Sequence, residues 1–176
     1  LGCVSYEEIA WAFVQAPQEH QEFIRKIQEK ILKHGYGQIQ VGLVTVTVAN
    51  LNSFNTFVPL GPGSAQISTP NILDAMTIKH EGTHAIQYHF LIDILEERMS
   101  LKDAEELAYR SFLSSDTSLH AHVEAYPNWV TCQENPFNPV CTGWEKGWNG
   151  YLEYGSTTYT QWQNHIDQRY TDLGLW

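Results

Sequence analysis

The sequence predicts an α+β fold in a single domain that spans residues 1–176. Alternation of apolar and polar residues, the mark of strands, is confined to residues 39–68. Helical spacing of apolar residues dominates the chain before and after that region, and strands that cluster rather than alternate with helices are typical of α+β proteins. The length of 176 residues, with 43% apolar and 17% charged residues, fits one globular domain.

The first predicted element is a helix over residues 5–34, where apolar residues mostly recur three or four positions apart. Pro17 should split this helix in two, because proline disfavours helical conformation at the residue before it. Gly35 and Gly37 follow the last helical turn, and glycine is typical of helix C-termini. We therefore expect the helix to end at His34.

Three strands are predicted next. Residues 39–48 alternate with a one-residue slip at Gly42, which we interpret as a bulge within a single strand. Residues 54–60 and 65–68 are predicted as two shorter strands. The segment 61–63, Gly-Pro-Gly, is predicted as the turn between them, because glycine and proline are the residues that tight turns favour.

Helices are predicted for most of the remaining chain. The first should run from about residue 71 to residue 90 or beyond, with Thr69 as its N-cap residue and Pro70 at its first position. After this helix, three segments show helical spacing of apolar residues, and one segment is rich in Gly, Pro and aromatic residues and is predicted as a loop. They are a helix over 101–112 capped by Ser100 with Asp103 in its first turn, helices over 117–130 and 157–170, and a loop over 136–155.

The charge balance excludes two classes of partner. Ten Lys and Arg residues against twenty Asp and Glu residues give a formal net charge of −10. Nucleic acid and anionic lipid both bind basic surfaces, so neither is an expected partner. No apolar run approaches the roughly 18 to 20 residues of a membrane span. The chain shows no initiating Met and no signal-peptide pattern, so we expect a processed product or an excised domain.

The segment with a chemical signature is His-Glu-x-x-His at residues 80–84, inside a predicted helix. His80 and His84 are four residues apart and therefore leave the same helix face about one turn apart. Two neutral imidazole nitrogens so placed can bind one Zn²⁺ at about 2.0 to 2.1 Å. Glu81 lies beside a ligand without being one, so it can accept a proton from a metal-activated water. The alternative is a helix with two solvated or hydrogen-bonded core histidines.

The context of the motif favours the metal over that alternative. Apolar residues occur on several sides of the helix, which predicts a buried helix, and buried His and Glu side chains need partners. Gly82 in mid-helix costs about 1 kcal/mol relative to Ala. It indicates either the close approach of a backbone or substrate, or a simple packing requirement. His89 lies about 180° around the helix from His80, so it is excluded from the site.

The motif resembles that of the zincin metallopeptidases. The metzincin branch has Gly and His where this chain has Gln87 and Phe90, so that branch is excluded. A glutamate on a later helix makes the chain similar to the gluzincin branch, and Glu124-Ala-Tyr resembles zincin domains of bacterial secreted and polymorphic toxins. The resemblance implies a zincin-like fold with a small N-terminal β-sheet, a buried active-site helix and a mainly helical C-terminal half.

The resemblance also implies the roles of individual residues. His80, His84 and Glu124 are the expected zinc ligands, with Glu81 as general base. Glu124 lies 40 residues after His84, and His120 is the alternative third ligand on the same helix face. Side chains able to stabilise the oxyanion or to support the ligands are His120, Tyr126 and Tyr154, together with Tyr151, Tyr159 and His165.

The sequence therefore predicts a zinc-dependent metallopeptidase acting on a protein or peptide substrate. One alternative is a zinc-stabilised binding or structural module, which would not need the uncoordinated base Glu81. Another is a zinc hydrolase of a non-peptide amide, such as a cell-wall crosslink.

The cysteines and the composition bear on where the protein acts. Cys132 and Cys141 enclose two Asn-Pro pairs that favour turns, which predicts a disulfide between them and leaves Cys3 over. Two unrelated buried thiols are the alternative. A composition low in Lys and rich in Asn, Gln, Thr and Trp, together with the disulfide, predicts a secreted or extracytoplasmic protein, including one delivered as an effector.

Overall fold

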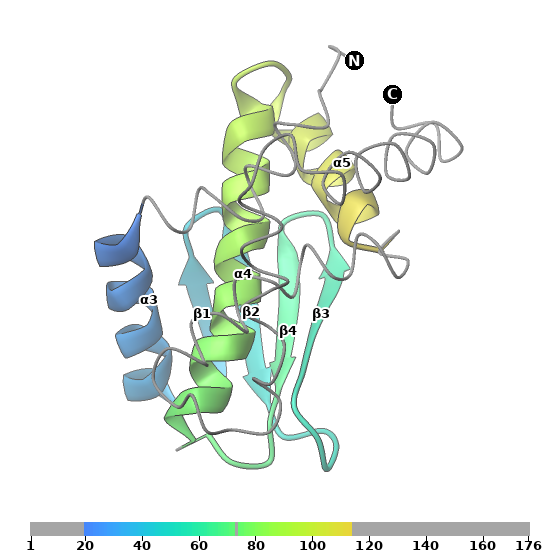
Figure 1. Cartoon of the computed structure of the whole chain (residues 1–176). Helices are drawn as coiled ribbons and strands as arrows, with labels where there is room; N and C mark the ends of the chain where they lie inside the picture. Colours follow the sequence, from blue (N-terminus) through green and yellow to red (C-terminus); the bar gives the residue numbers. More distant parts are fainter. Residues whose placement is uncertain (1–19, 73, 114–176) are drawn as a thin grey trace, which may run out of the picture.

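A computed structural model of the chain describes residues 20–72 and 74–113 (Figure 1). The elements in chain order are α3 (Gln21–His34), β1 (Gly37–Val41), β2 (Val44–Ala49), β3 (Thr56–Gly61), β4 (Ser64–Ser68), α4 (Ala75–Glu96) and α5 (Leu101–Leu113). Helices packed on a small mixed sheet confirm the α+β class. The helices predicted over 117–130 and 157–170, the loop over 136–155 and the split near Pro17 lie outside the described residues.

In the described part of the chain, the sheet has four strands in the order β1-β2-β4-β3. β1 pairs antiparallel with β2, β2 pairs parallel with β4, and β3 pairs antiparallel with β4. Every second residue of β2 is buried, which shows that one face of the sheet forms the core. α4 lies over this face, with α3 beside β1 and α5 beside β3 (Figure 1).

The expected bulged strand over 39–48 is wrong, because the chain reverses at Gly42. Val41 pairs with Val44, so Gly42 and Leu43 form a two-residue hairpin turn between β1 and β2. Gly42 has a φ of 59° at the first turn position, as a type II′ turn requires. The slip in the alternation at Gly42 marks this turn. Val41 and Val44 pair on either side of the turn, and both side chains are buried in the core.

The two shorter strands are confirmed by β3 and β4. Gly61 pairs with Ser64, which leaves Pro62 and Gly63 as the turn between the strands. Gly63 has a φ of 70°, a conformation that favours glycine. The register shifts between Pro59 and Gly61, so β3 carries an irregularity next to the turn.

The predicted start of the long helix at Thr69 and Pro70 is wrong, because α4 begins at Ala75. Thr69 still belongs to the end of the sheet, where its N–H donates to the carbonyl of Ala49 at 2.9 Å. Asp74 caps the helix instead. Its carboxylate accepts hydrogen bonds from the N–H of Thr77 at 3.4 Å and from the Thr77 hydroxyl at 2.7 Å.

The predicted C-terminus of α3 and the predicted N-terminus of α5 are confirmed. α3 ends at His34 and is followed by Gly35 with a φ of 73°. α5 begins at Leu101, and the Ser100 hydroxyl accepts a hydrogen bond from the N–H of Asp103 at 3.1 Å.

Within the described residues, a hydrophobic core joins the sheet to α3, α4 and α5. α4 supplies its centre and is buried on several sides, as expected from its sequence. Its fully buried apolar side chains include Ile78, Ala85, Ile86, Tyr88, Leu91 and Ile92. Among the described residues we find no helix with both the length and the apolar character of a membrane-spanning segment.

Candidate metal centre

The His-Glu-x-x-His motif lies in the first half of α4, where the helix is enclosed by the sheet and by α3. His80 is half-buried, whereas Glu81 and His84 are 8% and 4% exposed. The prediction of a buried motif is therefore confirmed. Side chains as polar as these enter a protein core only with partners that compensate for lost hydration.

The rings of the two histidines lie side by side on α4. Their ring centroids lie 5.2 Å apart, and the ring planes are inclined at 79°. With zinc–nitrogen bonds of about 2.0 to 2.1 Å and a tetrahedral angle between them, two imidazole centroids lie about 5.2 Å apart. The centroid distance of the pair thus matches that of two imidazoles bound to one tetrahedral ion.

Besides His80, the ring of His84 contacts Gln87 and Phe57. Its Nδ1 atom lies 3.0 Å from Oε1 of Gln87, one turn further along α4. Phe57 from β3 packs against the same ring, with centroids 5.7 Å apart. Gln87 is fully buried, so this polar contact forms inside the core.

Another polar contact, on a neighbouring face of α4, joins α4 to α3. The Gln28 side-chain amide donates to the Thr83 hydroxyl at 3.2 Å and to the Lys79 carbonyl at 3.4 Å. Next to it, a Cβ placed on Gly82 would lie 3.1 Å from Cδ1 of Ile31. Of the two interpretations of Gly82, the structure supports packing, because the missing side chain makes room for α3.

His89 has a different role, in agreement with its exclusion from the site. Its Nδ1 atom accepts a hydrogen bond from the N–H of Leu43 at 2.9 Å, in the turn of the β1–β2 hairpin. Burial lowers the pKa of His89, with the charge of Asp93 opposing that shift and His20 adding to it. His89 thus holds the hairpin against α4 in its neutral form.

The residues predicted as the third zinc ligand lie outside the described residues. Within residues 20–72 and 74–113, no group of three His, Cys, Asp or Glu side chains is arranged to hold a metal. Glu124 and the alternative His120 lie outside this part of the chain. The side chains proposed to stabilise the oxyanion or to support the ligands, and the two cysteines of the predicted disulfide, also lie outside the described residues. They are Tyr126, Tyr151, Tyr154, Tyr159, His165, Cys132 and Cys141.

Comparisons with known proteins give no assignment. No family model matches the chain, and neither curated proteins nor solved structures provide a match. The chemistry of the site is therefore inferred from its own residues and their geometry.

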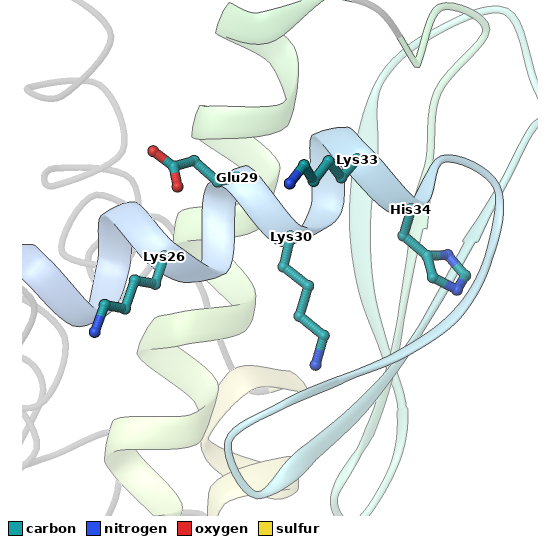
Figure 2. Close-up of a pocket in the computed structure, with 5 residues that line it drawn as sticks. All are labelled: Lys26, Glu29, Lys30, Lys33 and His34. Carbon is teal, nitrogen blue, oxygen red and sulfur yellow. The ribbon is translucent and has the colours of Figure 1, made fainter.

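A cavity of about 410 Å³ lies elsewhere, on the exposed side of α3 (Figure 2). Its described lining residues all belong to α3: Lys26, Glu29, Lys30, Lys33 and His34. Figure 2 shows Lys26 and Lys30 extending to the same side of the helix. Three ammonium groups oppose a divalent cation, so this cavity is not an extension of the metal centre.

The sequence reasoning missed Gln87 and Phe57 as neighbours of the candidate ligand His84. Gln87 counts against the metzincin pattern, and the sequence analysis predicts no contact between it and His84. A signal for it existed, since residues 84 and 87 share one helix face three positions apart. No local signal marks Phe57, which reaches the site through the pairing of β3 with the sheet.

Proposed function

We propose that the chain is a zinc-dependent metallopeptidase with a zincin-like fold, acting on protein or peptide substrates outside the cytoplasm. The observation that carries this proposal is the His80–His84 pair, whose ring separation of 5.2 Å suits one tetrahedral zinc ion. A buried glutamate directly after the first histidine adds to it. A structural zinc site needs no such uncoordinated carboxylate, so Glu81 favours a hydrolase.

In this proposal His80 and His84 hold the metal through imidazole nitrogens, and Glu124 or His120 completes the protein ligands. Zinc, when bound, polarises the scissile carbonyl and lowers the pKa of a coordinated water. Glu81 takes the proton from the attacking water and passes it to the leaving amine. The burial of Glu81 strengthens its electrostatic interactions, because solvent does not screen them.

The Glu81→Gln variant tests the proposal. The amide has the same shape as the carboxylate but cannot accept the proton, so we expect zinc to be retained and peptide hydrolysis to fall by about 10²- to 10⁴-fold. Hydrolysis would be measured on a peptide library, with the zinc content of each protein determined in parallel. Glu96→Gln is the matched control, because Glu96 is exposed at the far end of the same helix.

Each other outcome contradicts a stated part of the proposal. Equal hydrolysis by wild type and Glu81→Gln would rule out the general-base role. A wild type that holds zinc but cleaves no peptide would favour the structural module. Cleavage of a cell-wall amide without peptide cleavage would instead assign the non-peptide hydrolase.

A further inference from the structure

The contact between His84 and Gln87 has a consequence for how the metal is bound. We propose that Gln87 is a positioning residue, which fixes the tautomer and the ring orientation of His84 so that Nε2 faces the metal. This inference rests on the proposed function, since it concerns a ligand of the proposed zinc ion. The two side chains are 4% and 0% exposed, and His84 Nδ1 lies 3.0 Å from Gln87 Oε1.

The tautomer follows from the donor and acceptor inventory of the two groups. A side-chain amide oxygen only accepts hydrogen bonds, so with Oε1 of Gln87 toward the ring we assign the proton of neutral His84 to Nδ1. A neutral imidazole with a proton on Nδ1 has its lone pair on Nε2. Zinc needs that lone pair, so His84 is prepared to bind through Nε2 before any metal arrives.

The orientation of the ring is fixed from two directions. Gln87 contacts the Nδ1 side of the ring, and Phe57 packs against the ring from β3 at a centroid distance of 5.7 Å. Residues 80, 84 and 87 fall within about 60° on one side of α4, because successive helical residues turn by about 100°. Gln87 is therefore placed to orient His84 on the face that His84 shares with His80.

A metal-binding histidine commonly donates its other N–H to a carboxylate, backbone carbonyl or water, and mutation of such partners typically costs about 10- to 100-fold in metal affinity or activity. Gln87 has the position and chemistry of such a group. A purely structural role would be different, since Gln87 would then stabilise the fold without setting which nitrogen of His84 carries the proton. The tautomer of His84 separates the two roles.

The test uses long-range ¹H–¹⁵N NMR of the metal-free full chain, followed by zinc titration against a competing chelator. We expect His84 of the wild type to show a proton on Nδ1. Gln87→Leu should lose this preference and bind zinc about 10- to 100-fold more weakly. Gln87→Met, which keeps the length of the side chain, serves if the Leu variant does not fold. Gln87→Glu keeps an acceptor oxygen and should restore both properties.

Thr83→Val is the matched control, because it removes a buried polar group on the same helix that faces α3 instead of His84. It should lower stability but leave the tautomer and the zinc affinity unchanged. A wild-type His84 protonated on Nε2 would overturn the inference, as would a Gln87→Leu variant with unaltered tautomer and affinity. A wild type with the Nδ1 proton in place that binds no zinc would overturn the proposed function instead, and with it the role of Gln87 toward zinc.

Discussion

Burial and neighbours distinguish the proposed metal-binding histidines of α4 from His89, which has a structural role. His80 and His84 share a face and a ring separation suited to zinc, whereas His89 on the opposite face accepts a hydrogen bond from Leu43. A metal ligand must keep a lone pair free for the ion, and His89 uses its Nδ1 lone pair for a backbone N–H. The spacing of residues along the helix already separates these roles.

The role of His89 makes stability depend on pH. Burial lowers its pKa, so the folded state favours the neutral ring that accepts the hydrogen bond from Leu43. The contribution to the free energy of unfolding is complete above the ordinary histidine pKa of about 6.5, and it is lost as the pH falls toward the lowered folded pKa. His89→Asn keeps an acceptor but does not titrate. In urea unfolding between pH 7.5 and 5, we expect it to lose less stability than wild type.

His34→Asn is the control for that experiment, since His34 is exposed on α3. Its unfolding should follow the wild-type pH dependence. If wild type and His89→Asn lose stability equally over this range, the neutral His89 is not the source of the acid sensitivity.

At the scale of the elements, the β1–β2 hairpin depends on Gly42 for two reasons. Its φ of 59° is in the left-handed region, and a Cβ there would lie 2.3 Å from Nδ1 of His89. We predict that Gly42→Ala lowers the free energy of unfolding by more than the about 1 to 2 kcal/mol of left-handed strain alone, because of the additional clash. Chemical denaturation measures this change.

Gly61→Ala provides the matched comparison, because an added Cβ would meet no atom within 4 Å. Its effect should stay within about 0.5 kcal/mol, as at ordinary surface positions. Equal losses in the two variants would contradict the account of the Gly42 turn.

The start of α4 provides a second test at this scale. Asp74→Ala removes the side-chain acceptor for Thr77, and we expect a loss of about 1 kcal/mol in the free energy of unfolding. Asp74→Ser keeps a capping oxygen and should recover most of the loss. If Asp74→Ala leaves the free energy of unfolding unchanged, another residue caps the helix.

The predictions from sequence succeeded where the signal is local. Ser100 before α5, Gly35 after α3 and the Gly-Pro-Gly turn at residues 61–63 each depend on a few neighbouring residues. The reversal at Gly42 and the late start of α4 depend on pairing with other strands. Val41 pairs with Val44, and the N–H of Thr69 is held by Ala49, so local propensity did not decide either boundary.

The candidate site also has a part that local sequence predicts and a part that depends on long-range contacts. The spacing of His80 and His84 is a local property of a helix, so two ligands and the adjacent base could be proposed from sequence alone. The contact of Phe57 with His84 depends on the pairing of β3 with β4, which is a long-range property. The third ligand remains a prediction: Glu124 follows from the resemblance, and His120 from its place on the same helix face.

At the scale of the whole molecule, α4 is both the centre of the core and the carrier of the motif. A ligand bound only by the native state stabilises it, so zinc should stabilise the entire domain. With free zinc at 1,000 times its dissociation constant, the gain is about 4 kcal/mol. For a chain of this size we expect the thermal midpoint to rise by about 8 to 16 °C on adding zinc to the metal-free protein.

Differential scanning calorimetry with and without a chelator measures that shift. His80→Ala should show little or no response to zinc, whereas the exposed Lys26→Ala variant on α3 should respond like wild type. A midpoint that zinc leaves unchanged in the wild type would contradict a zinc site in the core.

The central claim is that His80 and His84 bind one zinc ion. Elemental analysis after equilibrium dialysis against zinc tests it most directly, with His34→Ala as a control that removes an exposed histidine. We predict one zinc per chain in the wild type and in His34→Ala, and a large loss of zinc in a folded His80→Ala variant. An undiminished zinc content in His80→Ala would contradict the account.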